Sequence, residues 1–323
     1  MKKLFYILSA LLVIISCQSE SEDPEEIGLE LNKINKNNEI VLNELPNPSL
    51  FYGYVNDVNN QGILVGDGVW INNEYSALDR GTYGYSEGNS INNQGQIAGF
   101  VANSFSDYSA AIWDRFNSDV TVLPKDSYRL GYARDINDQG IVVGFVRGPG
   151  TKPALWNNGE LTVLPIGDNT GGWAEGINDR GEIVGWVTKS GIDTPVIWKK
   201  GQLIPLDDEI EDENRGGQAW GINNQGQVVG TVDGKPALWD KGELITLPME
   251  SNIGGTAFCI SNSGKIVGIV DDMPAFWEDG KLIILPNDSK VYGEATGINE
   301  TGMISGHFSM PDGTGEPVFW TYK

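Results

Sequence analysis

A motif of the form A-x-G-I-N-x-x-G-x-I-V-G recurs seven times along the 323 residues, and a tryptophan follows each copy. The clearest copies are AEGINDRGEIVG, which begins at Ala174, and AWGINNQGQVVG, which begins at Ala219. Spacings between the turn glycines of successive copies are 33, 45, 41, 45, 38 and 38 residues. A repeat of about 40 residues built from short strands matches one blade of a β-propeller. These turn glycines are Gly62, Gly95, Gly140, Gly181, Gly226, Gly264 and Gly302.

Each repeat predicts four short strands, as the third copy illustrates. Its strands are expected at residues 132–137, 141–146, 153–156 and 160–164. An Asn-Asp-Gln-Gly turn separates the first two strands, and Asn157-Asn158-Gly159 separates the last two. Asn and Asp bond the local backbone in such turns, and Gly supplies a positive φ. The pattern therefore predicts an antiparallel four-stranded sheet in every copy.

The length of one connection varies strongly between copies. From the glycine of I-V-G to the tryptophan there are 14 residues at Gly99–Trp113 but only 4 at Gly66–Trp70. Alternate turns of a four-stranded meander lie on opposite faces, so these variable loops should share a face with the links between blades. Variable loops on a rigid scaffold often carry binding sites, so we expect ligand binding on this loop-rich face.

The last repeat lacks its fourth strand, and the start of the chain supplies a candidate. Residues 38–46, NEIVLNELP, resemble the segment Gly159–Pro165 that ends the third repeat. Nine residues separate Pro46 from Val55, as they separate Pro165 from Ala174. We therefore predict an all-β fold: a seven-bladed β-propeller of four-stranded blades, closed by an N-terminal strand that completes the C-terminal blade.

Seven of the ten tryptophans occupy the same place in the seven repeats. They could line an aromatic ligand groove, but burial between neighbouring blades is the preferred interpretation. The single histidine, His307, aligns with Phe100, Phe145 and Trp186, so it is also expected at a packing position. The repeated tryptophans are Trp70, Trp113, Trp156, Trp198, Trp239, Trp277 and Trp320.

The first residues predict export. Lys2 and Lys3 precede an apolar run that ends at Cys17, and the run is too short to span a bilayer. Residues 1–17 therefore resemble a lipoprotein signal with Cys17 as the lipidated residue; an ordinary signal peptide is the alternative. Residues 18–37 predict an acidic flexible tether, and residues 38–323 the propeller. The acidic run resembles the surface-export signal of Bacteroidetes lipoproteins, or is a plain spacer. We expect a protein anchored to the outer membrane, with the cell surface as one possible location.

Charge and cysteine content limit the partners. The formal net charge is −22, and removal of Lys2 and Lys3 with the signal changes it to −24. Such a surface repels nucleic acid and anionic lipid, so contact with the membrane is expected only through the lipid anchor. Much of the charge is explained equally well by solubility. After lipidation of Cys17 only Cys259 remains, so no intrachain disulfide is expected, and the domain is expected to be monomeric.

The motif followed by P-A-L-W or P-A-F-W resembles the bacterial extracellular HAF repeat over nearly everything from residue 38 onward. That resemblance implies an exported repeat protein with a propeller fold and supplies no catalytic residues. The family's His-Ala-Phe is replaced here by triplets such as Pro153-Ala154-Leu155, so no histidine role carries over. A looser similarity to RCC1-type blades rests on shared turn residues.

The sequence does not assemble a catalytic set. The chain lacks a His/Cys metal cluster, a Walker loop and a dinucleotide-binding glycine motif. An acidic run at residues 207–213 could bind Ca²⁺ weakly through Asp207, Asp208 and Asp212, although a solvated acidic loop is preferred. No other cofactor is expected.

Six aromatic residues are the candidate ligand-binding residues. All lie in or just before the first strand of a repeat and should cluster at the loop-rich mouth of the central channel. Aromatic faces beside carboxylates suit sugars and protein partners equally. The leading hypothesis is a non-enzymatic scaffold that binds a glycan or a protein; a carboxylate-dependent glycan hydrolase or lyase and a purely structural role are the alternatives. The six candidates are Tyr54, Tyr85, Tyr132, Trp173, Trp220 and Tyr292.

Overall fold

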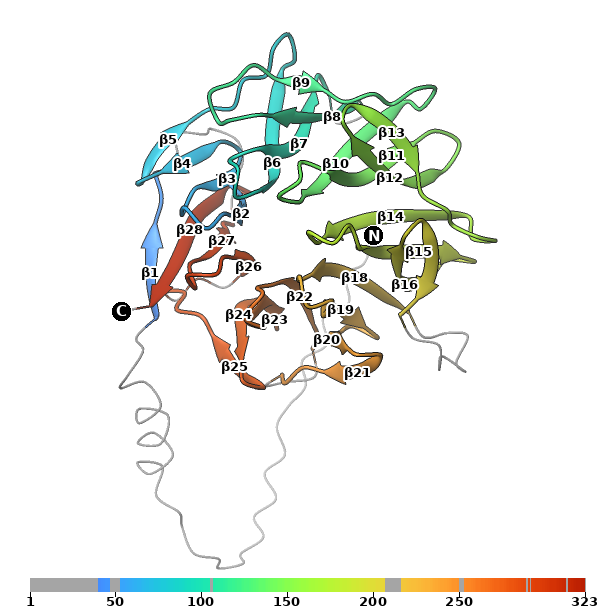
Figure 1. Cartoon of the computed structure of the whole chain (residues 1–323). Helices are drawn as coiled ribbons and strands as arrows, with labels where there is room; N and C mark the ends of the chain where they lie inside the picture. The colour runs from blue at the N-terminus through green and yellow to red at the C-terminus, as the bar shows by residue number, and fades with distance from the viewer. Residues whose placement is uncertain are drawn as a thin grey trace, which may run out of the picture. The chain divides into compact units, whose positions relative to one another are not determined.

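Seven four-stranded antiparallel sheets stand around a central axis in the computed structural model, as Figure 1 shows. All described residues belong to one compact unit, Ile40–Lys323. The predicted all-β, seven-bladed propeller is therefore confirmed. The structure describes residues 40–46, 53–104, 107–206, 216–249, 253–288, 290, 292–311 and 313–322.

Each blade runs from an inner strand at the axis to an outer strand at the rim. Blade 1 contains β2 (Val55–Val58), β3 (Leu64–Gly66), β4 (Val69–Ile71) and β5 (Glu74–Ser76). Blade 2 contains β6 (Tyr85–Ile91), β7 (Ile97–Ala102), β8 (Tyr108–Trp113) and β9 (Thr121–Val122). Blade 3 contains β10 (Leu130–Ile136), β11 (Val142–Arg147), β12 (Thr151–Asn157) and β13 (Glu160–Val163). Blade 4 contains β14 (Gly171–Ile177), β15 (Ile183–Lys189), β16 (Ile192–Lys199) and β17 (Gln202–Pro205).

The last three blades repeat this order until the final sheet. Blade 5 contains β18 (Gly217–Ile222), β19 (Val228–Val232), β20 (Lys235–Asp240) and β21 (Glu243–Thr246). Blade 6 contains β22 (Gly255–Ile260), β23 (Ile266–Val270), β24 (Met273–Glu278) and β25 (Lys281–Ile284). Blade 7 contains β26 (Gly293–Ile298), β27 (Ile304–Ser309) and β28 (Gly315–Tyr322), and its fourth strand is β1 (Ile40–Glu44).

Strand β1 closes the ring as the sequence predicts. It pairs antiparallel with β28, so that Leu42 lies opposite Trp320. Ile40 and Leu42 pack against the buried core of blade 7, and Leu45 is 6% exposed. The next blade also holds this segment, because Trp70 Nε1 donates to the carbonyl of Pro46 at 2.8 Å. This segment thus joins blade 7 to blade 1.

The repeated tryptophans are wedges between blades, which confirms their predicted packing role. All seven are at most 3% exposed. Trp156 Nε1 donates to Pro124 O at 2.7 Å, and Pro124 directly follows the outer strand region of the preceding blade. The equivalent partner of Trp239 falls at Asp207, outside the described residues. The same bond recurs from Trp70, Trp113, Trp198, Trp277 and Trp320.

Every inner strand carries an irregularity beside its second strand. In blade 3 the register shifts between Ala133 and Asp135, which leaves Arg134 without a direct cross-strand partner. The bulge brings the carbonyl of Tyr132 against Gly144, where an added Cβ would lie only 2.0 Å from that oxygen. The last glycine of the I-V-G motif is therefore required by close backbone approach.

Candidate functional site

The central channel is lined by the seven inner strands and has two chemically different ends. At one end, which we call the loop end, lie the links between blades and the hairpins between second and third strands. At the other, the turn end, lie the tight turns between first and second strands, such as 137–140. Tyr85, Tyr132 and Trp173 lie in the half of their inner strands nearer the loop end, and Tyr54 and Tyr292 directly precede theirs. Trp220 lies past the middle of β18, at the position equivalent to Arg134 and Glu175.

Trp173 and Trp220 belong to one aromatic arc that spans blades 4 to 6. Trp173 stacks on Trp186, with ring centroids 5.5 Å apart. Trp186 contacts Trp220 at 5.2 Å, and Trp220 contacts Phe258 at 5.7 Å. Trp186 is 7% exposed, whereas Trp173 and Trp220 are only partly buried. This arc is an apolar wall that retains accessible ring surface.

Tyr85 and Tyr132 belong to a second aromatic group in blades 2 and 3. Phe100 lies between them, with centroid distances of 5.8 Å to Tyr85 and 4.6 Å to Tyr132. Tyr132 also stacks on Phe145 at an interplanar angle of 3°. Burial raises the pKa of Tyr132, so its hydroxyl is neutral. Its sandwiched ring contributes more to packing between blades than to an open surface.

Tyr54 and Tyr292 lie apart from both groups, at blades 1 and 7. The Tyr54 ring lies 4.5 Å from the ring of His307, which is 9% exposed. Burial lowers the pKa of His307 to about 4, so the imidazole is neutral and packs as expected. Tyr292 is 37% exposed and donates its hydroxyl to Glu294 Oε1 at 3.1 Å. The six candidates therefore line the channel from its loop end to its middle and do not form a single cluster.

The wall at blades 1 and 2 is polar. Tyr85 donates its hydroxyl to Glu87 Oε2 at 2.6 Å, and Asn56 Nδ2 donates to Glu87 Oε1 at 3.0 Å. Burial raises the pKa of Glu87 above the ordinary range, although the Tyr85 and Asn56 donors oppose that shift. The loop end thus places a hydrogen-bonded carboxyl group across the channel from indole rings.

An ion pair between a partly exposed arginine and a buried glutamate lies deeper in the channel between blades 3 and 4. Arg134 Nε lies 2.9 Å from Glu175 Oε2, and the guanidinium covers the Tyr132 ring at 4.8 Å from its centroid. Glu175 is 7% exposed, and its Oε1 has no hydrogen-bond partner. Burial raises the pKa of Glu175 to about 7, although Arg134 opposes the rise. Sequence analysis did not single out either residue, because a charge inside a strand motif resembles a solvated position.

At the turn end the channel opens into a polar cavity of about 190 Å³. Six asparagines after the inner strands hydrogen-bond across blade boundaries around this cavity. Asn178 Nδ2, for example, donates to Asn223 O at 3.0 Å, while Asn178 Oδ1 accepts the N–H groups of Arg180 and Glu182. The same bridging bond is made by Asn59, Asn92, Asn137, Asn223 and Asn299.

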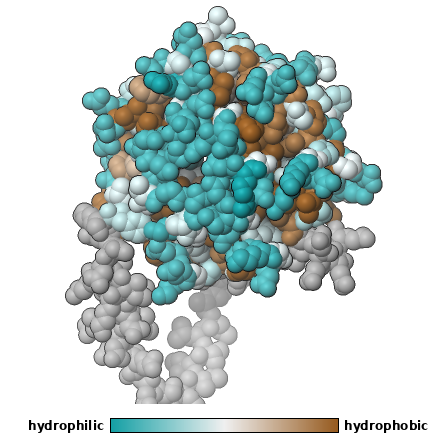
Figure 2. Space-filling model, in the orientation of Figure 1, coloured by the Kyte–Doolittle hydropathy of each residue, from teal (hydrophilic) through white to brown (hydrophobic). Residues whose placement is uncertain are grey.

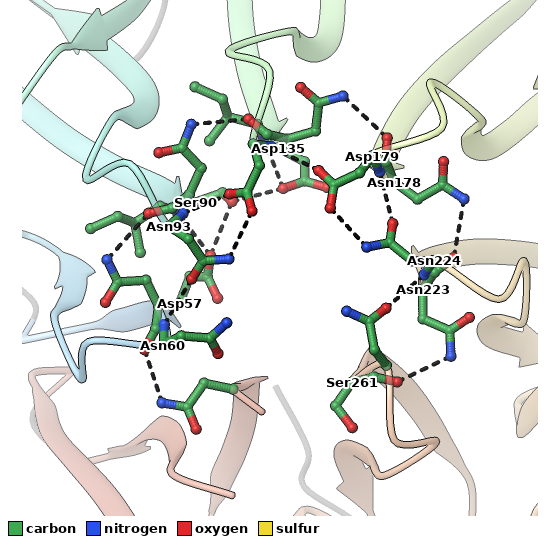
Figure 3. A pocket seen from close by; sticks show the side chains of 18 of the residues that line it. Asp57, Asn60, Ser90, Asn93, Asp135, Asn178, Asp179, Asn223, Asn224 and Ser261 are labelled. Carbon is green, nitrogen blue, oxygen red and sulfur yellow. Dashed lines mark hydrogen bonds between the residues drawn. The ribbon is translucent and has the colours of Figure 1, made fainter. Parts of the chain in front are cut away.

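The next residue of each turn forms a second ring that includes all seven blades. Its side-chain oxygen accepts the backbone N–H of the equivalent residue in the preceding blade, at 2.8–3.0 Å. Figure 3 shows part of this ring, and Figure 2 shows hydrophilic residues gathered around the centre of one face. The members are Asn60, Asn93, Asp138, Asp179, Asn224, Asn262 and Glu300.

The cavity is acidic. Its lining includes five carboxyl groups and no lysine or arginine. The repeated asparagine of the motif could have predicted the first ring of hydrogen bonds, which it makes between blades. The sequence analysis assigned this asparagine only to the local turn. Within the described residues no group of three or more His, Cys, Asp or Glu is arranged to hold a metal ion. The five acidic residues are Asp57, Asp135, Asp138, Asp179 and Glu300.

Several sequence predictions fall outside the described residues. Cys17, the tether 18–37 and the weak Ca²⁺ candidates Asp207, Asp208 and Asp212 all lie there. None of the described residues belongs to a helix long and apolar enough to cross a membrane.

Comparison with known proteins shows similarity of fold. No protein-family model and no curated protein matches the chain. The structure of YCF48 bound to D1 peptide is 15% identical, covers 89% of this chain and 96% of its own, and has a TM-score of 0.54. An acylaminoacyl peptidase from Pyrococcus horikoshii is 12% identical over 84% of this chain and 51% of its own, with a TM-score of 0.52. The fucose-specific lectin from Aleuria aurantia is 10% identical over 72% and 92%, with a TM-score of 0.42.

Proposed function

We propose that the chain is a non-enzymatic binding scaffold that holds a protein or glycan partner at the loop end of its channel. The observation that carries this proposal is the arc from Trp173 to Phe258, which offers partly accessible indole rings opposite the Glu87 carboxyl group. Apolar ring faces bind sugar C–H groups or apolar side chains, and carboxyl oxygens accept hydrogen bonds from hydroxyl or amide groups. The propeller of similar fold, YCF48, is bound to a peptide, so a peptide ligand is compatible with the fold.

Two substitutions test the loop end directly. We expect Trp220→Ala and Tyr292→Ala each to weaken binding of the best ligand at least about tenfold, because aromatic anchors dominate such interfaces. Arrays of immobilised polysaccharides and of peptides identify that ligand, and calorimetry then measures its affinity. A polysaccharide hit would select the glycan class, and a peptide hit the protein class.

Ile245→Ala provides the matched control. Ile245 is 43% exposed on outer strand β21, far from the channel in the sheet order, so its loss should leave affinity unchanged. Circular dichroism must show that all variants remain folded. Full affinity in both channel variants would contradict binding at the loop end.

The hydrolase alternative needs two accessible carboxyl groups in reach of one glycosidic bond. Two of the partly buried acids are engaged by the backbone instead. Asp135 accepts the N–H groups of Ile136 and Ile177 on its two oxygens, and Asp57 accepts those of Val58 and Ile91. Such saturation suits a structural role and supports the binding proposal.

We also propose that the protein is an exported lipoprotein anchored to the outer membrane through Cys17, with residues 18–37 as its tether. Growth of expressing cells with an alkyne fatty acid should label the wild-type chain and leave Cys17→Ala unlabelled, because the thiol is the acceptor. Cys259→Ala is the control and should be labelled like the wild type. Equal labelling of the Cys17→Ala variant would exclude this anchor.

A further inference from the structure

One serine bridges two partly buried carboxyl groups on the channel wall. Ser90 Oγ lies 3.0 Å from Asp57 Oδ2 and 2.7 Å from Asp135 Oδ1, so the group joins blades 1, 2 and 3 (Figure 3). Ser90 itself is 6% exposed. Both distances are those of hydrogen bonds between oxygens.

If both carboxyl groups are ionised, the three side chains have only one hydrogen for the two hydrogen bonds at Ser90. A serine hydroxyl has one hydrogen to donate, and an ionised carboxylate has none. The backbone N–H groups of Ile91 and Ile136 reach the same two carboxyl oxygens, but they supply no hydrogen between these oxygens and Ser90. One of the two Ser90 contacts would then press a hydroxyl lone pair against a carboxylate oxygen.

We propose that Asp57, Ser90 and Asp135 form a proton-sharing clasp between the first three blades. Asp57 carries the proton and donates it to Ser90 Oγ, and Ser90 donates its own hydrogen to ionised Asp135. The shorter contact is the one to Asp135, as expected for a bond to a charged acceptor. The inference is independent of the proposed binding function.

The surroundings favour this protonation state. Burial raises the pKa of Asp57 to about 7, and the charge of Asp135 adds to the rise; burial also raises the pKa of Asp135. Arg134, which lies on the same strand as Asp135, is paired with Glu175 and not with Asp135. Strands β3, β7 and β8 carry no charged residue, and Arg147 at the end of β11 bonds Thr151. Three further groups interact electrostatically with Asp57 or Asp135: Glu175, Asp179 and Cys259. The remaining titratable groups on strands β6, β10 and blade 7 are Glu44, Tyr85, Glu87, Tyr132, Glu294, His307, Glu316 and Tyr322.

Only blades 1 to 3 carry the side chains that form the clasp. The equivalent positions in blades 4, 5 and 7 are glycines. In blade 7 the Asp57 carboxyl group occupies the space beside that glycine, Gly297. A Cβ on Gly297 would lie 2.8 Å from Asp57 Oδ1. The clasp is therefore a specific feature of blades 1 to 3 and not a property of the repeat.

The clasp makes stability depend on pH. The folded-state pKa of Asp57 is above its unfolded value, so the folded chain binds one more proton between about pH 4 and pH 7. As the pH rises across this window, the equilibrium constant for folding should fall by up to tenfold per pH unit, and above about pH 7 it should level off. Acidification through the window strengthens the link between blades.

Infrared spectroscopy and urea unfolding of the full chain test the clasp together. At pH 6 the difference spectrum of wild type minus Asp57→Asn should contain the carbonyl stretch of a protonated carboxyl group, and this band should vanish by pH 9. As the pH rises from 5 to 7, the free energy of unfolding should fall more steeply for the wild type than for Asp57→Asn. Asp126→Asn is the matched control: it removes one acidic group at an exposed position with a φ of 47°, which Asn tolerates.

Other outcomes would overturn the proposal. Equal pH slopes, or a difference spectrum without the band, would show that Asp57 is ionised. The band could also disappear when CaCl₂ or NaCl is added at constant pH, together with a rise in melting temperature. That result would show that a bound cation, and not a shared proton, holds the two carboxylates together when these ions are present. If Asp57→Asn does not fold, Asp135→Asn replaces it, because a lone carboxylate needs only the Ser90 hydrogen and should also lose the band.

Discussion

Deletion of residues 38–46 is expected to unfold the propeller or to convert it into oligomers. The chain would lose the pairing of β1 with β28, the contacts of Ile40, Leu42 and Leu45, and the Pro46 carbonyl that receives Trp70 Nε1. Burial of the three aliphatic side chains alone contributes up to about 1.5–3 kcal/mol each, which together approaches the whole stability of an ordinary domain. The exposed edge of β28 would also become a template for pairing with another chain.

Thermal melting and size-exclusion chromatography check this expectation. Deletion of residues 18–37 is the control, because the sequence predicts a solvated tether there and the strand remains. Leu42→Asp is a milder variant that keeps the backbone and places a charge opposite Trp320. A monomeric 38–46 deletion with wild-type melting would show that the ring does not depend on this strand.

Much of the fold was predictable because one packing solution is repeated. The periodic tryptophans, the Asn-x-x-Gly turns and the phase of Pro46 relative to Val55 each depend on local sequence, and all three are confirmed. The predicted strand at residues 160–164 is observed as Glu160–Val163, one residue shorter at its end. Boundaries shift because a strand ends where its partner ends, which the sequence of one strand does not encode.

The functional site was less accessible to sequence reasoning. The six aromatic candidates share a position in the repeat, yet the structure distributes them into separate groups. Tyr132 is enclosed by Phe100 and Phe145, whereas Trp173 and Trp220 keep partly open rings. The difference depends on residues contributed by second strands, which a comparison of first strands omits.

The polar interior was missed for a related reason. Asp57, Ser90 and Asp135 occupy the motif's glycine position in three successive blades, and each looks like an isolated departure from the repeat. Only the closed ring places them beside one another, since 33 and 45 residues separate Ser90 from the two acids. Contacts between blades therefore carry information that the repeat pattern does not.

Replacement of Gly144 by alanine is expected to destabilise the fold by about 3 kcal/mol or more, since nothing near the new methyl group can yield. The added Cβ would lie 2.0 Å from Tyr132 O and 3.0 Å from Ala133 Cα, which are backbone atoms fixed by the bulge of β10. A Cβ added to the equivalent glycine of each of the other six blades would lie 1.9–2.1 Å from the equivalent carbonyl oxygen of that blade. The constraint is thus built into every copy of the motif.

Gly131→Ala separates this effect from the general cost or gain of replacing glycine. Gly131 lies on the same strand, β10, and its added Cβ would be no nearer than 3.4 Å to any atom outside its neighbours. We expect a change within about 1 kcal/mol there, because the new methyl group makes ordinary contacts and alanine stiffens the unfolded chain. Urea unfolding measures both variants. Similar stabilities for Gly131→Ala and Gly144→Ala would mean that the bulge relaxes, and that the glycine of I-V-G serves the flexibility of the strand instead of the approach of two backbones.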